Sequence, residues 1–318
     1  MADMRYRPLG DSGLIVSVVG LGCNNFGWRT NLNRSRAVVE TALEQGITFF
    51  DTADVYGESE DFLGRILKGR RDDVVIATKF GSDLHGALGD DYGARAARRY
   101  VRLAVERSLT RLRTDWIDLY QLHRSDEATP IEETLSVLTD LMHEGKVRYI
   151  GSSNLSGWQI VDADWTARTH NLERFISAQA RYNLLDRRAE AEIIPASLHA
   201  GVGVIPYYPL ASGLLTGKYR RGEAPPEASR LQGRAQELTE ERFDRIEAIE
   251  RFAEERGLSL LDVAIGGLAA LPSVASVIAG ATSPEQVRAN VAAGTWIPDP
   301  SDLEALDTVT SSARTGRF

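Results

Sequence analysis

Short apolar segments rich in β-branched residues recur along the chain, and each has the length and composition of a buried strand. Most of them begin about 30 residues apart, which is the length of one strand–helix unit. Eight segments are interpreted as strands, at residues 15–19, 47–50, 74–78, 117–122, 147–150, 175–178, 202–208 and 274–278. This recurrence predicts a parallel sheet built from successive strand–helix units.

The segments between these strands have apolar residues at the three- and four-residue spacing of amphipathic helices. This pattern is plain in residues 38–45, 62–67, 101–112 and 131–142. A further helix near the C-terminus has a recognisable start, with Ser283 at the N-cap, Pro284 at the first helical position and Gln286 at the third, as in a capping box. Eight strands alternating with helices predict an α/β fold that closes into a (β/α)8 TIM barrel.

The predicted barrel has its longest loops on one face. Residues 80–98 and 210–239 lie within the two longest intervals between strands. Both segments follow strands, so both belong to the C-terminal face, where the active sites of TIM barrels lie. Residues 1–13 predict an N-terminal β-hairpin at the bottom of the barrel, because Asp11-Ser12-Gly13 is a turn signal. No linker with a shift in composition divides the chain, so we expect residues 1–318 to form a single barrel domain.

Composition narrows the classes of partner. The chain has 37 Lys and Arg against 45 Asp and Glu, a formal charge of −8, which argues against nucleic-acid and membrane partners. A single cysteine, Cys23, excludes a disulfide framework and a cysteine-based zinc site, and we expect no metal. No apolar run approaches the ~20 residues of a membrane span, and the N-terminus lacks a secretory signal, so we expect a cytoplasmic protein. The oligomeric state stays open.

Polar residues at the ends of three successive strands are the candidates for chemistry. Asp51 and Tyr56 follow the second predicted strand, Lys79 ends the third and His123 follows the fourth. In a barrel these strand ends are neighbours on one face, so the four side chains can converge. Taken singly, Asp51 could cap a helix, and Tyr56 and His123 could be ordinary structural residues. Lys79 is harder to explain in this way, because a buried lysine is rare unless it is paired.

Together the four residues can protonate a carbonyl oxygen. Asp51 would hold Lys79 charged, and the ammonium would lower the pKa of Tyr56 from about 10 toward the working range. Tyr56 would then donate a proton to a substrate oxygen that His123 also hydrogen-bonds. These groups supply no electrons, so we expect a nicotinamide as the hydride donor.

Two other classes of enzyme compete with this interpretation. A Rossmann dehydrogenase is suggested by Gly20-Leu-Gly22 after a strand, but Asn25 stands where the third glycine of that fingerprint belongs. A class I aldolase could use Lys79 for a Schiff base, although an Asp51 partner favours a charged lysine.

The chain resembles the aldo-keto reductases in ordered motifs from about residue 5 to residue 310. The motifs are residues 20–22, 49–57, 77–79, 119–124, 145–154, 179–183, 209–218 and 280–286, with Asn290. The resemblance implies a (β/α)8 barrel that reduces small aldehydes or ketones with NADPH. It also implies that Asp51, Tyr56, Lys79 and His123 form the catalytic tetrad, with Tyr56 as the general acid.

The resemblance further implies a set of cofactor-binding residues. Near the nicotinamide and its ribose they are Gly22, Cys23, Asn24, Asp51, Ser153, Asn154, Gln179 and Tyr207. Along the pyrophosphate they are Tyr208, Pro209, Leu210, Ala211, Ser212, Gly213, Leu214 and Lys218. Around the 2′-phosphate and the adenosine they are Arg230, Gly280, Thr282, Gln286 and Asn290.

Two departures from the family pattern bear on the choice of cofactor. Ala289 stands where many relatives have a glutamate that contacts adenine, and Ala281-Thr282 replaces the basic-Ser phosphate clamp of other branches. Residues 218–230 must then supply most of the positive charge, with Arg288 as a further candidate. We therefore expect NADPH, and use of NADH stays open.

The sequence determines the identity of the substrate less closely than the reaction, and it leaves open a second function. The candidates for the substrate pocket are Phe26, Trp28, Phe80, Tyr92, Arg124 and Tyr182. The aromatic residues favour an apolar or aromatic carbonyl, whereas Arg124 either pairs with Asp126 or meets an anionic substrate. Because some relatives associate with membrane channels, the alternative is a regulatory NADP(H)-binding subunit with little or no catalysis. His123 keeps the catalytic residue type at a position that differs in some of those relatives.

Overall fold

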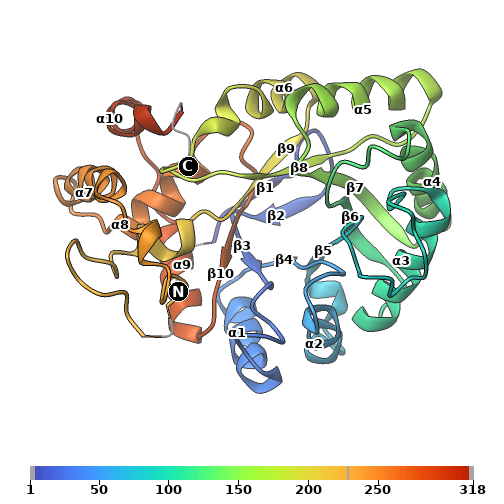
Figure 1. The fold of residues 1–318 in the computed structure, drawn as a ribbon, viewed down its shortest axis with the longest axis horizontal. Helices are drawn as coiled ribbons and strands as arrows, with labels where there is room; N and C mark the ends of the chain where they lie inside the picture. Colours follow the sequence, from blue (N-terminus) through green and yellow to red (C-terminus); the bar gives the residue numbers. More distant parts are fainter. Residues whose placement is uncertain (1–3, 228, 315–318) are drawn as a thin grey trace.

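Eight parallel strands form one sheet that curls into a nearly closed barrel, as the computed structural model of the chain shows (Figure 1). The structure describes residues 4–227 and 229–314. The strands are β3 (Val19–Gly22), β4 (Phe49–Asp51), β5 (Val75–Phe80), β6 (Ile117–Leu122), β7 (Val147–Ser153), β8 (Ser177–Arg181), β9 (Gly203–Tyr207) and β10 (Val277–Gly280).

The strand order around the sheet is β10-β3-β4-β5-β6-β7-β8-β9, and the remaining seam between β9 and β10 is joined by a short bridge. There the amide of Val204 donates to the carbonyl of Ser273 at 2.7 Å, and the amide of Ala275 donates to the carbonyl of Val204 at 2.9 Å. The (β/α)8 fold is therefore confirmed. A Rossmann fold is excluded, since its sheet is open rather than rolled into a barrel.

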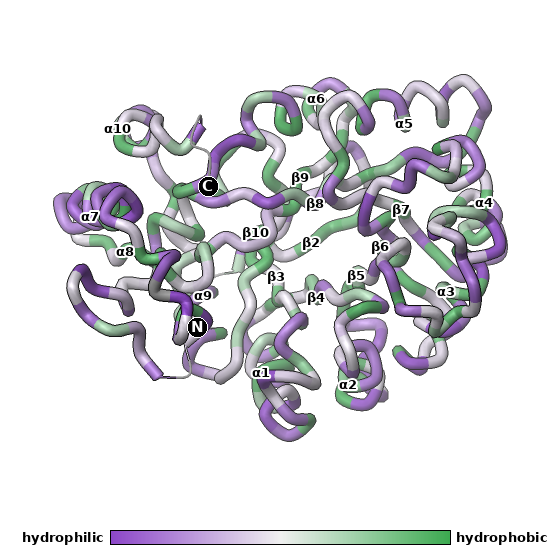
Figure 2. The backbone as a smooth tube through the Cα atoms, in the orientation of Figure 1, coloured by the Kyte–Doolittle hydropathy of each residue, from purple (hydrophilic) through white to green (hydrophobic). Residues whose placement is uncertain are grey.

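Helices surround the barrel and follow the chain around it (Figure 1). Their bounds are α1 (Leu32–Glu44), α2 (Ser59–Ile66), α3 (Arg98–Leu112), α4 (Ile131–His143), α5 (Gly157–His170), α6 (Ile193–Ala200), α7 (Glu240–Glu254), α8 (Leu260–Asp262), α9 (Pro284–Ala293) and α10 (Pro300–Thr310). In Figure 2 hydrophilic colour prevails on outer helices such as α7, whereas the barrel strands are mostly hydrophobic or neutral. In the part of the chain that is described, no helix combines the length and apolarity needed to cross a membrane.

The start of α9 follows the sequence prediction in part. Ser283 is the N-cap and accepts from the amide of Gln286 at 3.4 Å, and Pro284 takes the first helical position. The side chain of Gln286, however, accepts from the amide of Thr282 at 2.8 Å rather than from that of Ser283. The predicted capping box is thus shifted by one residue, and it fixes the loop before α9 instead of the cap itself.

The N-terminal hairpin extends further along the chain than predicted. Strand β1 (Tyr6–Pro8) pairs antiparallel with β2 (Ile15–Ser17), so the hairpin takes most of the segment interpreted as the first barrel strand. The first barrel strand is β3 instead. The chain turns at Ser17, whose hydroxyl donates to the carbonyl of Val19 at 2.8 Å and accepts from the amide of Thr48 at 3.1 Å. Residues 1–3 of the predicted hairpin lie outside the described residues.

The hairpin closes the N-terminal end of the barrel. Leu9 and Val16 belong to a buried cluster with Phe49, Leu119 and Ile205, which come from three different barrel strands. The amide of Gly203 in β9 lies close to the hairpin turn, where a Cβ atom on Gly10 would meet it at 2.6 Å. Substrate access is therefore confined to the opposite end of the barrel.

We predict that Gly10→Ala lowers the free energy of unfolding by about 2 kcal/mol or more, because Gly10 combines a left-handed backbone with close packing. Its φ is 59°, and an added Cβ would also lie 2.6 Å from the carbonyl of Gly201 and 2.7 Å from that of Ile176. The control is Gly69→Ala, which has a φ of 80° but nothing within 4 Å, and which should cost only about 1 kcal/mol. Urea unfolding measures both, and an equal loss in the two variants would refute a packing role for the hairpin turn.

Candidate active site

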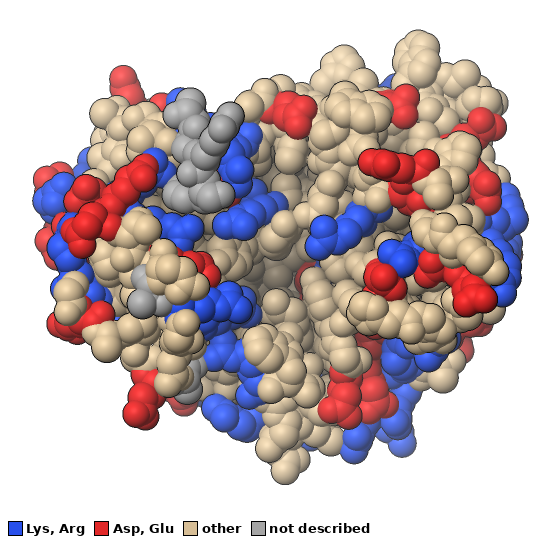
Figure 3. All heavy atoms as spheres, in the orientation of Figure 1, with Lys and Arg blue, Asp and Glu red and all other residues tan. Residues whose placement is uncertain are grey.

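A cleft of about 810 Å³ opens at the carboxyl ends of the barrel strands. The loops after β3, β4, β5, β6, β7 and β9 contribute to its walls, as do Gln179 of β8 and the first two turns of α9. Figure 3 looks onto this face: the surface is hollowed near its centre, Lys and Arg gather around the hollow, and most Asp and Glu lie toward the periphery. The cleft thus lies where TIM barrels place their active sites, and its surroundings are more basic than the chain as a whole.

A buried ion pair lies at the base of the cleft. The Lys79 ammonium at the end of β5 donates to both carboxylate oxygens of Asp51 at 2.8 Å and to the carbonyl of Thr52 at 2.7 Å. Lys79 is fully buried and Asp51 is 4% exposed. Gln179, from β8, donates its side-chain amide to Asp51 at 2.7 Å. Three strand ends therefore fix the position of the ammonium.

The ammonium of Lys79 remains charged at neutral pH. Burial lowers the pKa of Lys79, but the carboxylate of Asp51 and the hydroxyl of Tyr56 outweigh burial, so this pKa lies above its ordinary value. Breaking such a pair by removing one partner leaves an uncompensated buried charge, which typically costs about 3–5 kcal/mol. Lys79 is therefore held as a cation beside the ring of Tyr56.

Tyr56 lies between the ion pair and His123. The Lys79 nitrogen is 5.1 Å from the centre of the Tyr56 ring, and the rings of Tyr56 and His123 meet edge to face with their centres 5.8 Å apart. Burial raises the pKa of Tyr56 above its ordinary value, by more than Lys79 lowers it. The expectation of a net lowering is therefore corrected: desolvation is the larger effect, and Lys79 only limits the rise.

His123 is neutral and oriented by a serine. Burial lowers its pKa to about 3, and the positive charges of Lys79 and Arg124 add to this effect. Its Nδ1 lies 2.9 Å from the hydroxyl of Ser82, which follows β5. The other ring nitrogen, Nε2, has no partner among residues 4–227 and 229–314 and remains for a ligand. Nothing in the sequence around Ser82 marked it, because the contact depends on how the loop after β5 folds back.

Asp54, two residues before Tyr56, is a second buried acid. Both carboxylate oxygens of Asp54 lack a hydrogen-bond partner within the described residues, although the side chain belongs to a residue that is only 7% exposed. Glu60, in α2, accepts from Thr78 and from Arg111, each at 2.6 Å. Burial, and then the charge of Glu60, raise the pKa of Asp54 to about 7. The sequence placed Asp54 in a motif but gave no sign that its carboxyl group is buried and unpaired.

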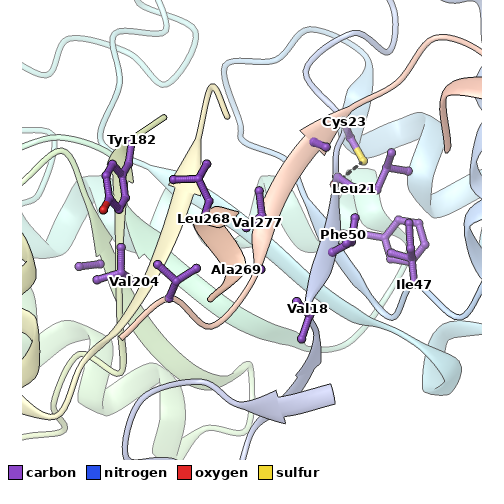
Figure 4. Close-up of a cluster of buried hydrophobic side chains, with 14 of the residues drawn as sticks. Val18, Leu21, Cys23, Ile47, Phe50, Tyr182, Val204, Leu268, Ala269 and Val277 are labelled. Atoms are coloured by element: carbon purple, nitrogen blue, oxygen red, sulfur yellow. Dashed lines mark hydrogen bonds between the residues drawn. The ribbon is translucent and has the colours of Figure 1, made fainter. Parts of the chain in front are cut away.

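Most of the residues implied for the cofactor line the cleft. These are Gly22, Asn24, Asp51, Ser153, Asn154, Gln179, Tyr207, Tyr208, Pro209, Leu210, Ala211, Ser212, Gly213, Lys218, Arg230, Gly280, Thr282, Gln286 and Asn290. Cys23 and Leu214 do not line it, because both point into the core. In Figure 4 the Cys23 thiol lies beside Leu21, whose carbonyl it approaches at 3.6 Å.

Three cations gather at one side of the cleft: Arg29 after β3, and Lys218 and Arg230 after β9. Burial lowers the pKa of Lys218, and the neighbouring Arg29 and Arg230 lower it further. Arg230 donates to the side-chain oxygen of Asn25 at 2.9 Å, and no carboxylate pairs with Lys218 or Arg230 in the described part of the chain. Lys218 and Arg230, which have no acid partner among the described residues, are therefore suited to a bound anion.

Arg29 replaces one of the sequence-based candidates for this cluster. Arg288 was the further candidate for positive charge, but it lies within 4.0 Å of Glu285 and does not line the cleft. Nothing in the sequence indicated that Arg29, in the loop after β3, lines the cleft and lowers the pKa of Lys218.

The loop after β9 has a strained backbone where it lines the cleft. Tyr208, Ala211 and Ser212 have φ angles of 64°, 46° and 60°, which residues other than glycine rarely adopt. Gly213 continues this conformation with a φ of 91°, and a Cβ there would lie 2.6 Å from the Lys218 ammonium. Such strain costs about 1–3 kcal/mol per residue and is concentrated at functional sites. It brings Lys218 back over the loop.

One asparagine connects the opposite walls of the reacting end. Asn154, after β7, accepts from the hydroxyl of Tyr207 at 2.7 Å and donates to the carbonyl of His123 at 2.9 Å. These bonds fix the Tyr207 ring relative to His123.

Of the residues predicted for the substrate pocket, only Arg124 lines the cleft. Phe26, Phe80 and Tyr182 are at most 1% exposed and belong to the core. Trp28 and Tyr92 are 69% and 91% exposed and lie outside the cleft. These five residues are therefore not assigned to the pocket.

Strand alternation explains part of this result. Successive side chains of a strand point to opposite faces, so a Lys79 that faces the cleft sends the next residue, Phe80, into the surrounding helices. There Phe80 packs against Tyr120 with ring centres 4.7 Å apart. The cleft gains Val55, Ser82 and Asp83 instead.

The barrel and the cleft at its carboxyl end define a TIM-barrel protein with a site built on its strand ends. Residues 18–310 match the family model of the aldo/keto reductase family, and the chain belongs to that family.

Several curated relatives cover nearly the whole chain. The oxidoreductase YrpG of Bacillus subtilis is 36% identical over 96% of each chain. A probable voltage-gated potassium channel subunit beta of Arabidopsis thaliana is 33% identical over 97% of each chain. The L-glyceraldehyde 3-phosphate reductase of Escherichia coli K12 is 34% identical over 92% of this chain and 88% of its own. The chain is an oxidoreductase of a family that uses nicotinamide cofactors and takes small carbonyl substrates.

We predict that Asp54→Asn stabilises the protein above pH 7, because its pKa of about 7 in the folded state lies above the ordinary value of 3.8. A raised pKa makes the protonated carboxyl contribute stability below about pH 4, and this contribution is lost as the pH rises through about 7. The loss is worth up to about 4 kcal/mol, since each pKa unit is worth about 1.4 kcal/mol.

Urea unfolding of the wild type and of Asp54→Asn between pH 4 and pH 8 measures this effect. The difference between the two proteins should grow with pH in favour of the variant. A difference that does not change with pH would contradict a titrating Asp54.

Proposed function

We propose that the chain is an NADPH-dependent reductase of small aldehydes or ketones, in which Tyr56 is the general acid and Lys79, Asp51 and His123 assist it. The observation that carries this proposal is the position of Tyr56 between a buried ammonium and a neutral imidazole, at the base of the cleft.

The surroundings of Tyr56 suit it to act as a general acid. Because burial raises its pKa, Tyr56 is protonated at neutral pH and has a proton to donate. The neighbouring Lys79 ammonium lowers the cost of the phenolate that is left behind. Asp51 acts on this step only by holding Lys79 charged and in place.

His123 is suited to orienting the substrate oxygen. If the Ser82 hydroxyl donates to Nδ1, the ring proton is on Nε2, which can donate to the same oxygen that Tyr56 protonates. A pKa of about 3 keeps the ring from competing as an acid at neutral pH. Tyr56 therefore donates the proton, and His123 orients the substrate oxygen.

The cleft fits a dinucleotide that carries an extra phosphate. When bound, the nicotinamide cofactor supplies the hydride. Arg29, Lys218 and Arg230 would hold the 2′-phosphate, because these cations gather in the cleft and no acid pairs with Lys218 or Arg230 within the described residues. Tyr207 would lie against the nicotinamide, and the strained loop after β9 would follow the pyrophosphate.

The remaining residues would bind the two ends of the cofactor. Ser153, Asn154 and Gln179 would bind the carboxamide. Gly280, Thr282, Gln286 and Asn290 would surround the adenosine.

The aldolase alternative is less well supported. A Schiff base requires a neutral lysine amine, whereas Lys79 has a raised pKa and donates to both oxygens of Asp51.

A regulatory cofactor-binding subunit is the second candidate function. The similarity to the probable channel beta subunit of Arabidopsis thaliana favours it. The reductases of glyceraldehyde 3-phosphate and of versiconal hemiacetal acetate, each 34% identical, favour carbonyl reduction. A neutral His123 in contact with Tyr56 supports the reductase, since a subunit that only binds cofactor has no need of that arrangement.

We expect Tyr56→Phe to reduce carbonyl turnover about 10²- to 10⁴-fold, because phenylalanine preserves the ring but cannot donate a proton. The loss of reduced-nicotinamide absorbance with an aldehyde panel measures turnover, and fluorescence titration measures cofactor affinity. Affinity should stay within a few-fold of the wild type. Turnover within tenfold of the wild type would refute Tyr56 as the acid.

We expect Lys218→Ala and Arg230→Ala each to weaken NADPH binding about tenfold more than NADH binding, since only NADPH has the 2′-phosphate. Fluorescence titrations with each cofactor measure the two affinities. Arg288→Ala removes the same charge outside the cleft and should leave their ratio unchanged. Equal weakening of both cofactors by the cleft variants would show that these residues do not recognise the 2′-phosphate.

A further inference from the structure

The guanidinium of Arg124 is an exposed cation in the cleft that is not used by the protein itself. Arg124 directly follows His123 beyond the end of β6 and lines the cleft. Within residues 4–227 and 229–314 its side chain has no hydrogen bond or ion pair. An arginine that faces a cleft without a counter-ion is available to an anionic ligand, and its fork of donors suits a carboxylate or a phosphate.

The carboxylates near Arg124 are engaged elsewhere. Asp126, two residues further on, accepts from the amides of Ala96 and Ala128 at 2.7 and 2.9 Å and from the hydroxyl of Thr129 at 2.8 Å. Its oxygens therefore organise the loop after β6. The pairing of Arg124 with Asp126, which the sequence left open, is not formed.

The other acid near this end of the cleft is also occupied. Asp83 lines the cleft, where it pairs with Arg95 at 3.0 Å and accepts from the amide of His85 at 2.7 Å. The charge of Asp83 is thus balanced by Arg95. No described carboxylate in the cleft is left to neutralise Arg124, because Asp51 is held by Lys79.

Arg124 is separate from the three cations assigned to the cofactor. It follows β6, whereas Arg29 follows β3, and Lys218 and Arg230 follow β9. In the strand order, β4 and β5 separate β6 from β3, and β7 and β8 separate β6 from β9. The cofactor cluster therefore lies on the other side of the barrel mouth.

The charge of Arg124 instead acts on the reacting end of the cleft. After burial and Lys79, Arg124 contributes to the lowered pKa of His123. Burial raises the pKa of Tyr207, and Arg181 and Arg124 oppose that rise. Of these two arginines, Arg181 already pairs with Asp186 at 3.2 Å. Arg124 is thus the one that remains for a ligand beside His123 and Tyr207.

We propose that Arg124 determines substrate specificity by binding an anionic group, a carboxylate or a phosphate ester, on a carbonyl compound whose oxygen meets Tyr56 and His123. This inference rests on the proposed reductase function. It assigns the class of substrate, an anionic aldehyde or ketone, in place of the apolar carbonyl that the predicted aromatic pocket favoured.

The test compares two aldehydes, the carboxylate 4-formylbenzoate and its methyl ester, in which a methyl group removes the negative charge. The specificity constant for the carboxylate is divided by that for the ester, so that any general loss of activity cancels. The wild type should prefer the carboxylate, and Arg124→Gln should lower the ratio about tenfold, as expected for a charged hydrogen bond partly exposed to water. Arg124→Lys should keep part of the preference, since it keeps the charge but not the fork. Assays with 4-formylphenyl phosphate show whether a phosphate ester is favoured over a carboxylate.

Lys68→Gln is the matched control. It removes one positive charge from an exposed residue between α2 and β5, at the end of the barrel away from the cleft, and should leave the ratio unchanged. An unchanged ratio in Arg124→Gln, or an equal fall in Lys68→Gln, would overturn the inference.

A binding measurement separates failure of this inference from failure of the proposed function. If the wild type reduces neither of these aldehydes nor any member of the aldehyde panel, the proposed reductase is refuted. Calorimetric binding of 4-(hydroxymethyl)benzoate and its methyl ester requires no turnover. Tighter binding of the acid, lost in Arg124→Gln, supports an anion site at Arg124, and equal binding of acid and ester overturns it.

Discussion

The buried contact between Lys79 and Asp51 is the interaction on which the rest of the site depends. An ammonium without water costs several kcal/mol unless an opposite charge and further acceptors replace its hydration shell. Here the carboxylate of Asp51 and the carbonyl of Thr52 replace that shell, and Gln179 in turn fixes Asp51. The barrel makes this possible because β4, β5 and β8 deliver these groups to one point. The hairpin excludes water from the N-terminal end of the barrel.

Charge is divided between two regions of the cleft. At the reacting end Lys79 is paired with Asp51, and His123 is neutral. Lys79 is therefore the cation that would stabilise the negative charge of a developing phenolate on Tyr56. At the other side Arg29, Lys218 and Arg230 form a basic cluster, although the chain carries a net charge of −8. On the face that Figure 3 shows, Asp and Glu lie mainly toward the periphery. An acidic protein can thus offer a basic site to a small polyanion.

The sequence predicted the barrel well because each strand is a separate apolar segment between polar ones. The exception is residues 15–22, where hairpin strand and barrel strand form one apolar run and only the hydroxyl of Ser17 marks the bend. The convergence of Asp51, Lys79, Tyr56 and His123 followed from strand order alone. Alternation along a strand, had it been applied to Phe80 and Lys79, would have placed the phenylalanine in the core.

The remaining features depend on loop packing, which a periodic pattern does not encode. Ser82 contacts His123, and Arg29 lines the cleft together with Lys218, only because of how their loops fold back. The burial of Asp54 without a hydrogen-bond partner for its carboxylate among the described residues, and the effect of Glu60 in α2 on its pKa, could not be seen in its motif. Conversely, Trp28 and Tyr92 were plausible pocket aromatics, yet their loops leave them exposed.

The central claim is that Lys79, held by Asp51, makes Tyr56 an effective acid for carbonyl reduction. It is tested most directly by the rate of aldehyde-dependent NADPH oxidation in Lys79→Met, with circular dichroism and NADPH titration on the same sample. Our account predicts a rate at least about 100-fold below that of the wild type, with the fold retained and NADPH affinity within a few-fold. A folded variant whose rate stays within tenfold of the wild type would contradict it.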